Sequence, residues 1–170
     1  ELQQQIGELP LVAEDLGVIT DEVIALKQQF HLPGMAVLQF SFDHFDDNPH
    51  KPLNITPNTV SYTGTHDNDT TLGWYRSIDK KEQQYVAETL GIDTQEEVLD
   101  AMIFAALDSK ANLAVIPLQD YLSLDSEARM NTPGTIENNW LWAFTWEQLD
   151  IPVVSQKIYT RLEDSNRIVT

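Results

Sequence analysis

Four short apolar runs divide the chain and predict strands. They lie at residues 9–13, 35–40, 60–63 and 113–118, and each consists mainly of apolar or β-branched residues. Strands that are covered on both faces have such nearly continuous runs, whereas half-exposed strands alternate between apolar and polar residues. The pattern therefore favours strands that are buried inside a layered protein.

The segments between these runs have the spacing and the end signals of helices. Thr20 is a candidate N-cap for a helix that Pro33 and Gly34 stop. Further helices are predicted at 79–90, closed by Gly91, and at 95–110, opened by a capping box of Thr94 and Glu97. The tail from 146 to 162 predicts one or two short helices, while 42–57 and 120–139 read as irregular. Strands alternating with helices indicate an α/β fold with parallel strands and helices outside, in one domain over 1–170.

Polar side chains stand where two of the predicted strands end. Glu14 follows the first run, and residues 64–71 (GTHDNDTT) follow the run at 60–63. Parallel strands end at the same edge of a sheet, so the carboxylates of Glu14 and Asp67 are expected within roughly 10 Å of each other, as cleavage of a glycosidic bond requires. Two structural alternatives remain at this point: Glu14 and Asp15 cap the next helix, or Asp67 and Asn68 only shape a turn.

The same polar segment suggests a second chemistry. His66 and Asp67 form a His-Asp pair, which is typical of one class of metal-dependent phosphohydrolase, although there the pair sits on a helix. The tryptophans also have two interpretations. Trp140 lies in a polar loop and is the best candidate for stacking on a sugar ring, whereas Trp146 is expected to pack inside the protein.

Composition narrows the function classes. The net charge of −17 argues against nucleic acid and anionic membranes as partners, because phosphate groups are bound by clustered Lys and Arg. The chain has no cysteine, so neither a disulfide framework nor a thiolate metal site is available. No apolar run approaches the length of a membrane-spanning helix. A cytoplasmic protein without a cofactor is expected.

Several blocks taken together resemble the 4-α-glucanotransferases, also called amylomaltases or disproportionating enzymes. In chain order the blocks are VAEDLGVIT at 12–20, LPGM at 32–35, LQF at 38–40, NP at 48–49, YTGTHDNDTT at 62–71 and RMNTPGT at 129–135. The resemblance runs from about residue 9 to residue 142. Two places depart from the family pattern. The family usually has an aromatic residue and then a histidine in the loop after strand six, where His50 and Leu53 stand here, and Ala143 stands where an arginine is common.

The resemblance implies a retaining enzyme with a (β/α)8 barrel that moves segments of α-1,4-glucans and malto-oligosaccharides between chains. By matching position, Glu14 would be the general acid/base after strand five, and Asp67 the third carboxylate after strand seven. Residues 113–118 would be strand eight. The substrate-binding residues would be His66, Asn68, Asp69, Asn131 and Trp140, and no metal or other cofactor is implied.

The resemblance also implies that the chain is the C-terminal half of the barrel. The family's nucleophile is an aspartate after strand four, and that strand would precede Glu1. Such a fragment is expected to lack activity alone, and to self-associate or pair with the N-terminal half of the barrel. The alternatives are a carbohydrate-binding module without catalysis and a metal-dependent hydrolase that uses the His-Asp-Asn-Asp segment.

Overall fold

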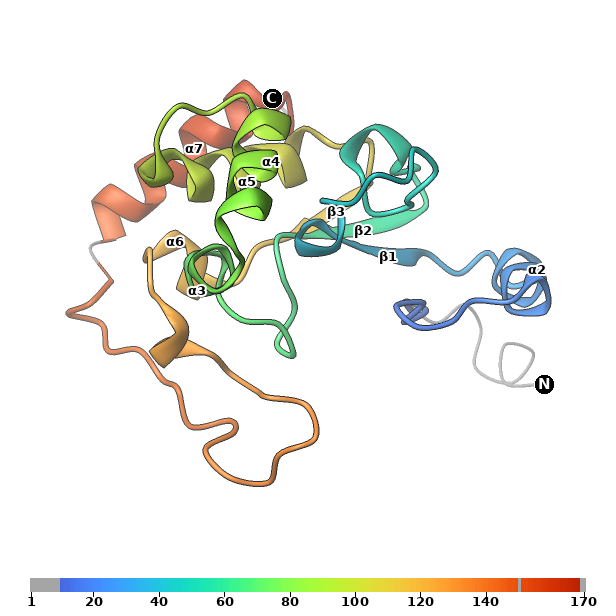
Figure 1. Ribbon diagram of the computed structural model, residues 1–170, viewed down its shortest axis with the longest axis horizontal. Helices are drawn as coiled ribbons and strands as arrows, with labels where there is room; N and C mark the ends of the chain where they lie inside the picture. The colour runs from blue at the N-terminus through green and yellow to red at the C-terminus, as the bar shows by residue number, and fades with distance from the viewer. Residues whose placement is uncertain (1–9, 150, 169–170) are drawn as a thin grey trace.

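A parallel β-sheet forms the centre of the chain (Figure 1). The computed structural model describes residues 10–149 and 151–168. Within these residues the strands are β1 Gly34–Val37, β2 Thr59–Tyr62 and β3 Leu113–Val115, hydrogen-bonded in the order β1-β2-β3. Val60 pairs with Met35 on one side and with Leu113 on the other. The predicted α/β class with parallel strands is confirmed, and β2 carries the polar loop from the middle of the sheet.

The predicted strand at 9–13 does not form in the described part, residues 10–13, and Leu9 lies outside the described residues. Only the start of a ladder is present, since the Ala13 amide donates to the Pro33 carbonyl at 2.8 Å. The next donor along β1, the Met35 amide, is taken by the carboxylate of Asp15 at 2.7 Å. The other oxygen of Asp15 pairs with Lys27 at 2.5 Å. A side chain thus replaces the backbone partner that a strand would supply.

Helices connect and flank the strands, and most lie within the ranges expected from the sequence. They are α2 Asp21–Gln29, α3 Thr71–Ser77, α4 Lys80–Leu90, α5 Val98–Asp108, α6 Leu118–Tyr121 and α7 Ile151–Asp164. Short 3₁₀ turns occur at Leu38–Phe40, Pro52–Asn54, Gln95–Glu97 and Ser126–Ala128. The capping box of Thr94 and Glu97 is present as predicted. In Figure 1, α2 lies beyond the start of β1, apart from the helices that gather at the other end of the sheet.

The core lies between the sheet and α5. One cluster contains Leu38, Val86 and Met102, and a second contains Leu99, Ile103 and Leu107. α5 contributes neighbouring stripes of side chains to the two clusters, so a broad face of this helix is buried. This burial fixes α5 behind β2 and leaves the other face of the sheet, lined by Met35, Tyr62 and Val115, open toward a cavity.

The tail differs from the prediction at its start. Trp146 does not pack inside the described part of the protein, because 71% of its surface is exposed and the helix begins later, at Ile151. Lys157 and Arg161 of α7 form ion pairs with Asp100 of α5. Beyond α7, the Arg167 guanidinium donates to carbonyl oxygens at the end of α5 and before β3, those of Leu107, Ser109 and Ala111. These ion pairs and hydrogen bonds therefore bind the segment from α7 to Arg167 to α5.

Across residues 10–149 and 151–168, every helix is too short or too polar to cross a membrane.

Candidate active site

The polar loop between β2 and α3 is held by its own side chains. Asn68 Oδ1 accepts hydrogen bonds from the Thr65 amide at 2.9 Å and from the Thr65 hydroxyl at 2.8 Å. Gln39, at the end of β1, donates from Nε2 to the Asp69 carbonyl at 2.9 Å. Gly64 lets this amide approach, since a Cβ there would lie 2.6 Å from Gln39 Nε2. The turn-forming role of Asn68 is therefore present, and its oxygen is already occupied.

Asp67 is fixed from three directions. Asn131 Nδ2 donates to Asp67 Oδ1 at 2.6 Å, and Arg129 Nη2 donates to the Asp67 carbonyl at 2.7 Å. His66 Nε2 lies 3.3 Å from the same Oδ1. The contacts from Asn131 and Arg129 cross from a segment more than 60 residues away. The two blocks that the sequence singled out, 62–71 and 129–135, are thus directly joined, and the second Asp67 oxygen is not engaged in these contacts.

Asp69 performs a different task. Its Oδ1 accepts the Thr70 amide at 2.8 Å, and its Oδ2 accepts the Ser126 hydroxyl at 2.7 Å. Gly73 packs closely against this pair, because a Cβ at that position would lie 2.8 Å from Asp69 Cγ. Both oxygens of Asp69 are therefore used to hold the loop to the start of α3 and to the segment after α6.

One cavity joins the residues that the sequence proposed as a site. Its volume is about 620 Å³, and its lining includes Glu14, His66, Asp67, Asn68, Asp69 and Trp140. Glu14 and Asp67 therefore face the same space. Asn131 reaches this cavity through Asp67 rather than by lining it.

Trp140 forms an aromatic wall of the cavity. Its ring centroid lies 5.1 Å from that of His66, and 61% of its surface is exposed. The backbone at Trp140 has a φ of 61°, which L-residues rarely adopt, and its amide donates to the Met130 carbonyl at 2.7 Å. A large, exposed aromatic side chain thus stands beside His66 at the wall of the cavity.

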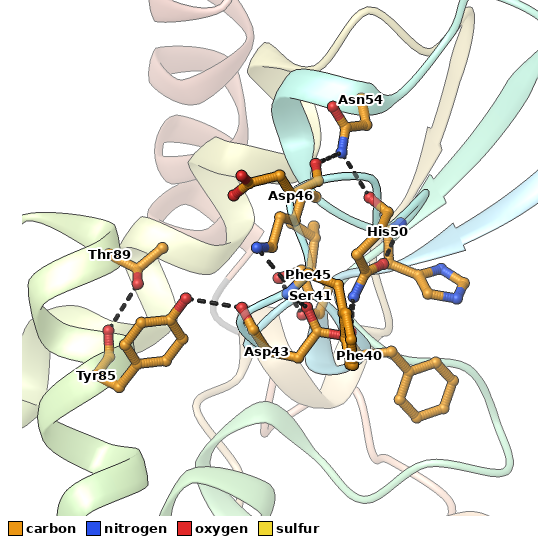
Figure 2. A network of polar contacts seen from close by, with 12 residues as sticks. Phe40, Ser41, Asp43, Phe45, Asp46, His50, Asn54, Tyr85 and Thr89 are labelled. Atoms are coloured by element: carbon orange, nitrogen blue, oxygen red, sulfur yellow. Dashed lines mark hydrogen bonds and ion pairs between the residues drawn. The ribbon is translucent and has the colours of Figure 1, made fainter.

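Polar side chains cross-link the loop after β1 through a network of hydrogen bonds (Figure 2). Asn48 Nδ2 donates to Asp43 Oδ2 and to the Phe40 carbonyl, both at 2.8 Å, and Asn54 Nδ2 donates to the Asp46 carbonyl at 2.7 Å. Tyr85 of α4 donates its hydroxyl to the Asp43 carbonyl at 2.7 Å. These bonds secure the loop to α4 and keep the side chain of Asp43 directed at its own loop.

His50 anchors that loop to β1. Its Nδ1 accepts the Val37 amide at 3.2 Å, and its ring packs edge-on against Phe40 at 5.5 Å between centroids. Burial lowers the pKa of His50, while the carboxylates of Asp15 and Asp43 oppose that shift. An accepting Nδ1 requires the neutral ring, so the bond and the lowered pKa agree.

Asp120 is a buried residue of the site that the sequence reasoning missed. It lies in α6 with 1% of its surface exposed and accepts from Thr63 and Thr71, at the two ends of the polar loop. Burial raises the pKa of its carboxyl group, and hydrogen bonds from Thr63 and Thr71 oppose the rise. A signal existed, because Asp120 follows the fourth predicted strand at the edge where Glu14 and Asp67 were sought.

In the part of the chain that the structure describes, no three His, Cys, Asp or Glu side chains gather closely enough to hold a metal ion. The metal-dependent alternative therefore receives no support from the geometry of His66 and Asp67.

Comparison with known proteins gives consistent results. The family model described as 4-alpha-glucanotransferase matches residues 1–148. The 4-alpha-glucanotransferase of Thermus thermophilus is 52% identical over 149 residues, which are 84% of this chain and 30% of that protein. The chloroplastic or amyloplastic 4-alpha-glucanotransferase DPE1 of Oryza sativa subsp. japonica is 48% identical over 83% of this chain and 24% of its own length.

Solved structures agree in fold. An amylomaltase from Streptococcus agalactiae, in complex with acarbose, superposes with a TM-score of 0.90 at 26% identity and covers 97% of this chain. That match occupies 33% of the amylomaltase chain, so the present chain spans about a third or less of the relatives it matches. The family model covers most of the chain and the identities are high. The chain therefore belongs to the 4-alpha-glucanotransferase family.

Proposed function

We propose that this chain is the part of a 4-α-glucanotransferase that carries the acid/base and the third carboxylate. The observation that supports this best is the single cavity lined by both Glu14 and Asp67, in a chain whose residues 1–148 match the family. The substrates would be α-1,4-glucans and malto-oligosaccharides. The cavity is lined mainly by neutral, aromatic and acidic groups, with Arg129 as a basic one, which suits an uncharged sugar.

In the proposed reaction Glu14 donates a proton to the glycosidic oxygen as the bond from that oxygen to the anomeric carbon breaks. An aspartate of the full-length protein attacks the same carbon and forms a covalent glycosyl intermediate. Glu14 then takes the proton of the 4-hydroxyl of an incoming glucan, whose oxygen displaces the aspartate. The same carboxyl group thus acts as acid and then as base.

The other site residues would hold the reacting glucose. Asp67 has one oxygen bound by Asn131, which leaves the other for sugar hydroxyls. His66 and Trp140 present ring faces and a ring nitrogen to the same cavity. Because the side-chain oxygens of Asn68 and Asp69 are already engaged, we assign them to sugar binding only through the shape of the loop. This refines the expectation that all these residues touch the substrate.

The architecture is also part of the proposal. The three parallel strands would be strands six, seven and eight of a (β/α)8 barrel, with Glu14 after strand five. The nucleophile would follow strand four, in sequence preceding Glu1. A cytoplasmic location is likewise proposed. The name of the rice relative places that protein in chloroplasts or amyloplasts.

The test uses the full-length protein with maltotriose as donor and acceptor and glucose release as readout. Glu14→Gln should lower kcat by about 10³-fold or more, since it removes the proton transfer in both steps. It should retain binding of acarbose, measured by calorimetry. Glu147→Gln serves as a control with the same change of side chain, because Glu147 is exposed and does not line the cavity. Retained turnover in Glu14→Gln would contradict the assignment.

A second measurement separates the proposal from a carbohydrate-binding module. The chain of residues 1–170, purified alone, should not disproportionate maltotriose over hours at high concentration, because no covalent intermediate can form without the nucleophile. The full-length protein should do so. If the full-length protein binds malto-oligosaccharides but never transfers them, the binding module is the better interpretation.

A further inference from the structure

The carboxylate of Asp120 is buried, and it accepts hydrogen bonds from both ends of the polar loop. Its Oδ2 accepts the hydroxyl of Thr63 at 2.6 Å and that of Thr71 at 2.8 Å, and its Oδ1 accepts the Thr71 amide at 2.9 Å. Thr63 directly follows β2, and Thr71 is the first residue of α3. Asp120 therefore ties the two ends of the loop 64–70 to one point.

Such a buried carboxylate is costly unless it is well satisfied. Burial raises the pKa of its carboxyl group, and Asp69 adds to this rise as a nearby negative charge. An aliphatic side chain would avoid this cost and still fill the space, but it could not accept these hydrogen bonds. The hydrogen bonds that Asp120 accepts from Thr63 and Thr71 therefore explain its presence, and they fix the loop that carries Asp67.

We propose that Asp120 is a positioning residue that clamps both ends of the loop 64–70 and so sets where Asp67 stands in the cavity. This rests on the proposed role of Asp67. Thr63 and Thr71 transmit the effect, because each is fully buried and donates its hydroxyl to Asp120. Gln39 holds the Asp69 carbonyl and, through its backbone amide, the Thr63 carbonyl, and Ser126 holds the Asp69 side chain. Neither of these residues contacts Thr71 in those bonds, so neither ties both ends of the loop together.

The variants are made in the full-length protein. Asp120→Ala removes all the acceptors and should lower kcat for maltotriose disproportionation about a hundredfold, the effect of misplacing a reacting group by roughly 1 Å. KM should change little by comparison. Asp120→Asn can turn its oxygen to the Thr71 amide and its NH₂ to the two hydroxyls, which then accept. It should recover most of kcat.

Hydrogen exchange reports the clamp without using activity. In the absence of substrate, amides of residues 64–71 should exchange faster in Asp120→Ala than in the wild type, and Asp120→Asn should restore most of the protection. Asp108→Asn is the control, since Asp108 is an exposed carboxylate at the end of α5 and does not line the cavity. It should leave both exchange and kcat unchanged.

A second pair of variants covers the case in which Asp120→Ala does not fold. Thr63→Val keeps the shape and loses the hydroxyl, whereas Thr63→Ser keeps the hydroxyl, so only Thr63→Val should loosen the loop and lower kcat. A folded Asp120→Ala or Thr63→Val enzyme with wild-type kcat, or with lower kcat but unchanged loop exchange, would overturn the proposal. An inactive wild-type enzyme would instead overturn the proposed function. The clamp would still be tested in that case, because hydrogen exchange of the loop is measured without turnover.

Discussion

At the scale of single residues, the conformation of the polar loop depends on the absence of a side chain at Gly64 as well as on its charged groups. Gly64 has an ordinary backbone conformation, but the side-chain amide of Gln39 occupies the place where a Cβ would stand. That amide holds the Asp69 carbonyl. The glycine thus permits a bond between the end of β1 and the loop after β2.

Gly64→Ala should therefore displace Gln39 and break its bond to the Asp69 carbonyl. In the full-length protein we expect a loss of about 1 kcal/mol in the free energy of unfolding, the net value of one such bond, and a lower kcat. Chemical unfolding and glucose release measure the two effects. Gly17→Ala is the matched control, since a Cβ there meets no atom within 4 Å. Equal effects of the two substitutions would refute the explanation.

His50 predicts a dependence of stability on pH. Its pKa is lowered by burial, so the unfolded chain binds the proton more readily than the folded one. The stability it contributes is complete above the ordinary histidine pKa, about 6.5, and is lost as pH falls from there through the folded-state pKa. Between pH 7.5 and 5, the wild type should lose about 1 kcal/mol more than His50→Gln, whose amide oxygen accepts the Val37 amide at any pH. If the free energy of unfolding falls equally with pH in the two proteins, His50 does not cause the pH dependence.

At the scale of elements, the sequence predicted what depends on local pattern. The apolar runs at 35–40, 60–63 and 113–118 overlap β1, β2 and β3, and the capping signals located α4 and the turn before α5. The strand predicted at 9–13 does not form in the described residues 10–13. A strand there would have to accept the Met35 amide with its backbone, and the side chain of Asp15 accepts that amide instead. α6 was missed because four residues after a proline carry no periodicity. Asp120 was missed with it.

α3 begins where the polar loop ends, so its cap belongs to the site. The Thr70 hydroxyl accepts the Gly73 amide at 3.1 Å. Thr70→Ala should cost about 1 kcal/mol of stability through loss of this cap, whereas Thr70→Ser should cost little. Thermal unfolding of the full-length protein provides the measurement. A Thr70→Ser variant as unstable as Thr70→Ala would show that the methyl group, not the hydroxyl, stabilises the helix start.

At the scale of the whole molecule, α5 covers one face of the sheet, whereas the other face is exposed at β3. Ala114 packs against the α5 cluster, while its neighbours Leu113 and Val115 are exposed on the opposite face. Pairing of an open edge and burial of such a face both favour association. The half-barrel proposal accounts for this exposure, although the sequence could only suggest it through family resemblance.

The isolated chain of residues 1–170 should therefore self-associate at micromolar concentrations. Light scattering after size-exclusion chromatography measures this, and Val115→Lys should shift the distribution toward monomer by placing a charge on the open face. Added N-terminal half of the barrel should compete with self-association. A compact monomer at all concentrations would contradict the prediction.

The bonds of Arg167 have a consequence for the order of events during synthesis. The ribosome makes the carbonyl groups of Leu107, Ser109 and Ala111 long before it makes the guanidinium that binds them. Until Arg167 emerges, water must satisfy these carbonyls, so the junction between α5 and β3 stays incomplete on the nascent chain. Folding of this junction is therefore completed only by Arg167. In nascent chains stalled before Arg167, a protease should cleave the junction between α5 and β3 faster than in longer chains.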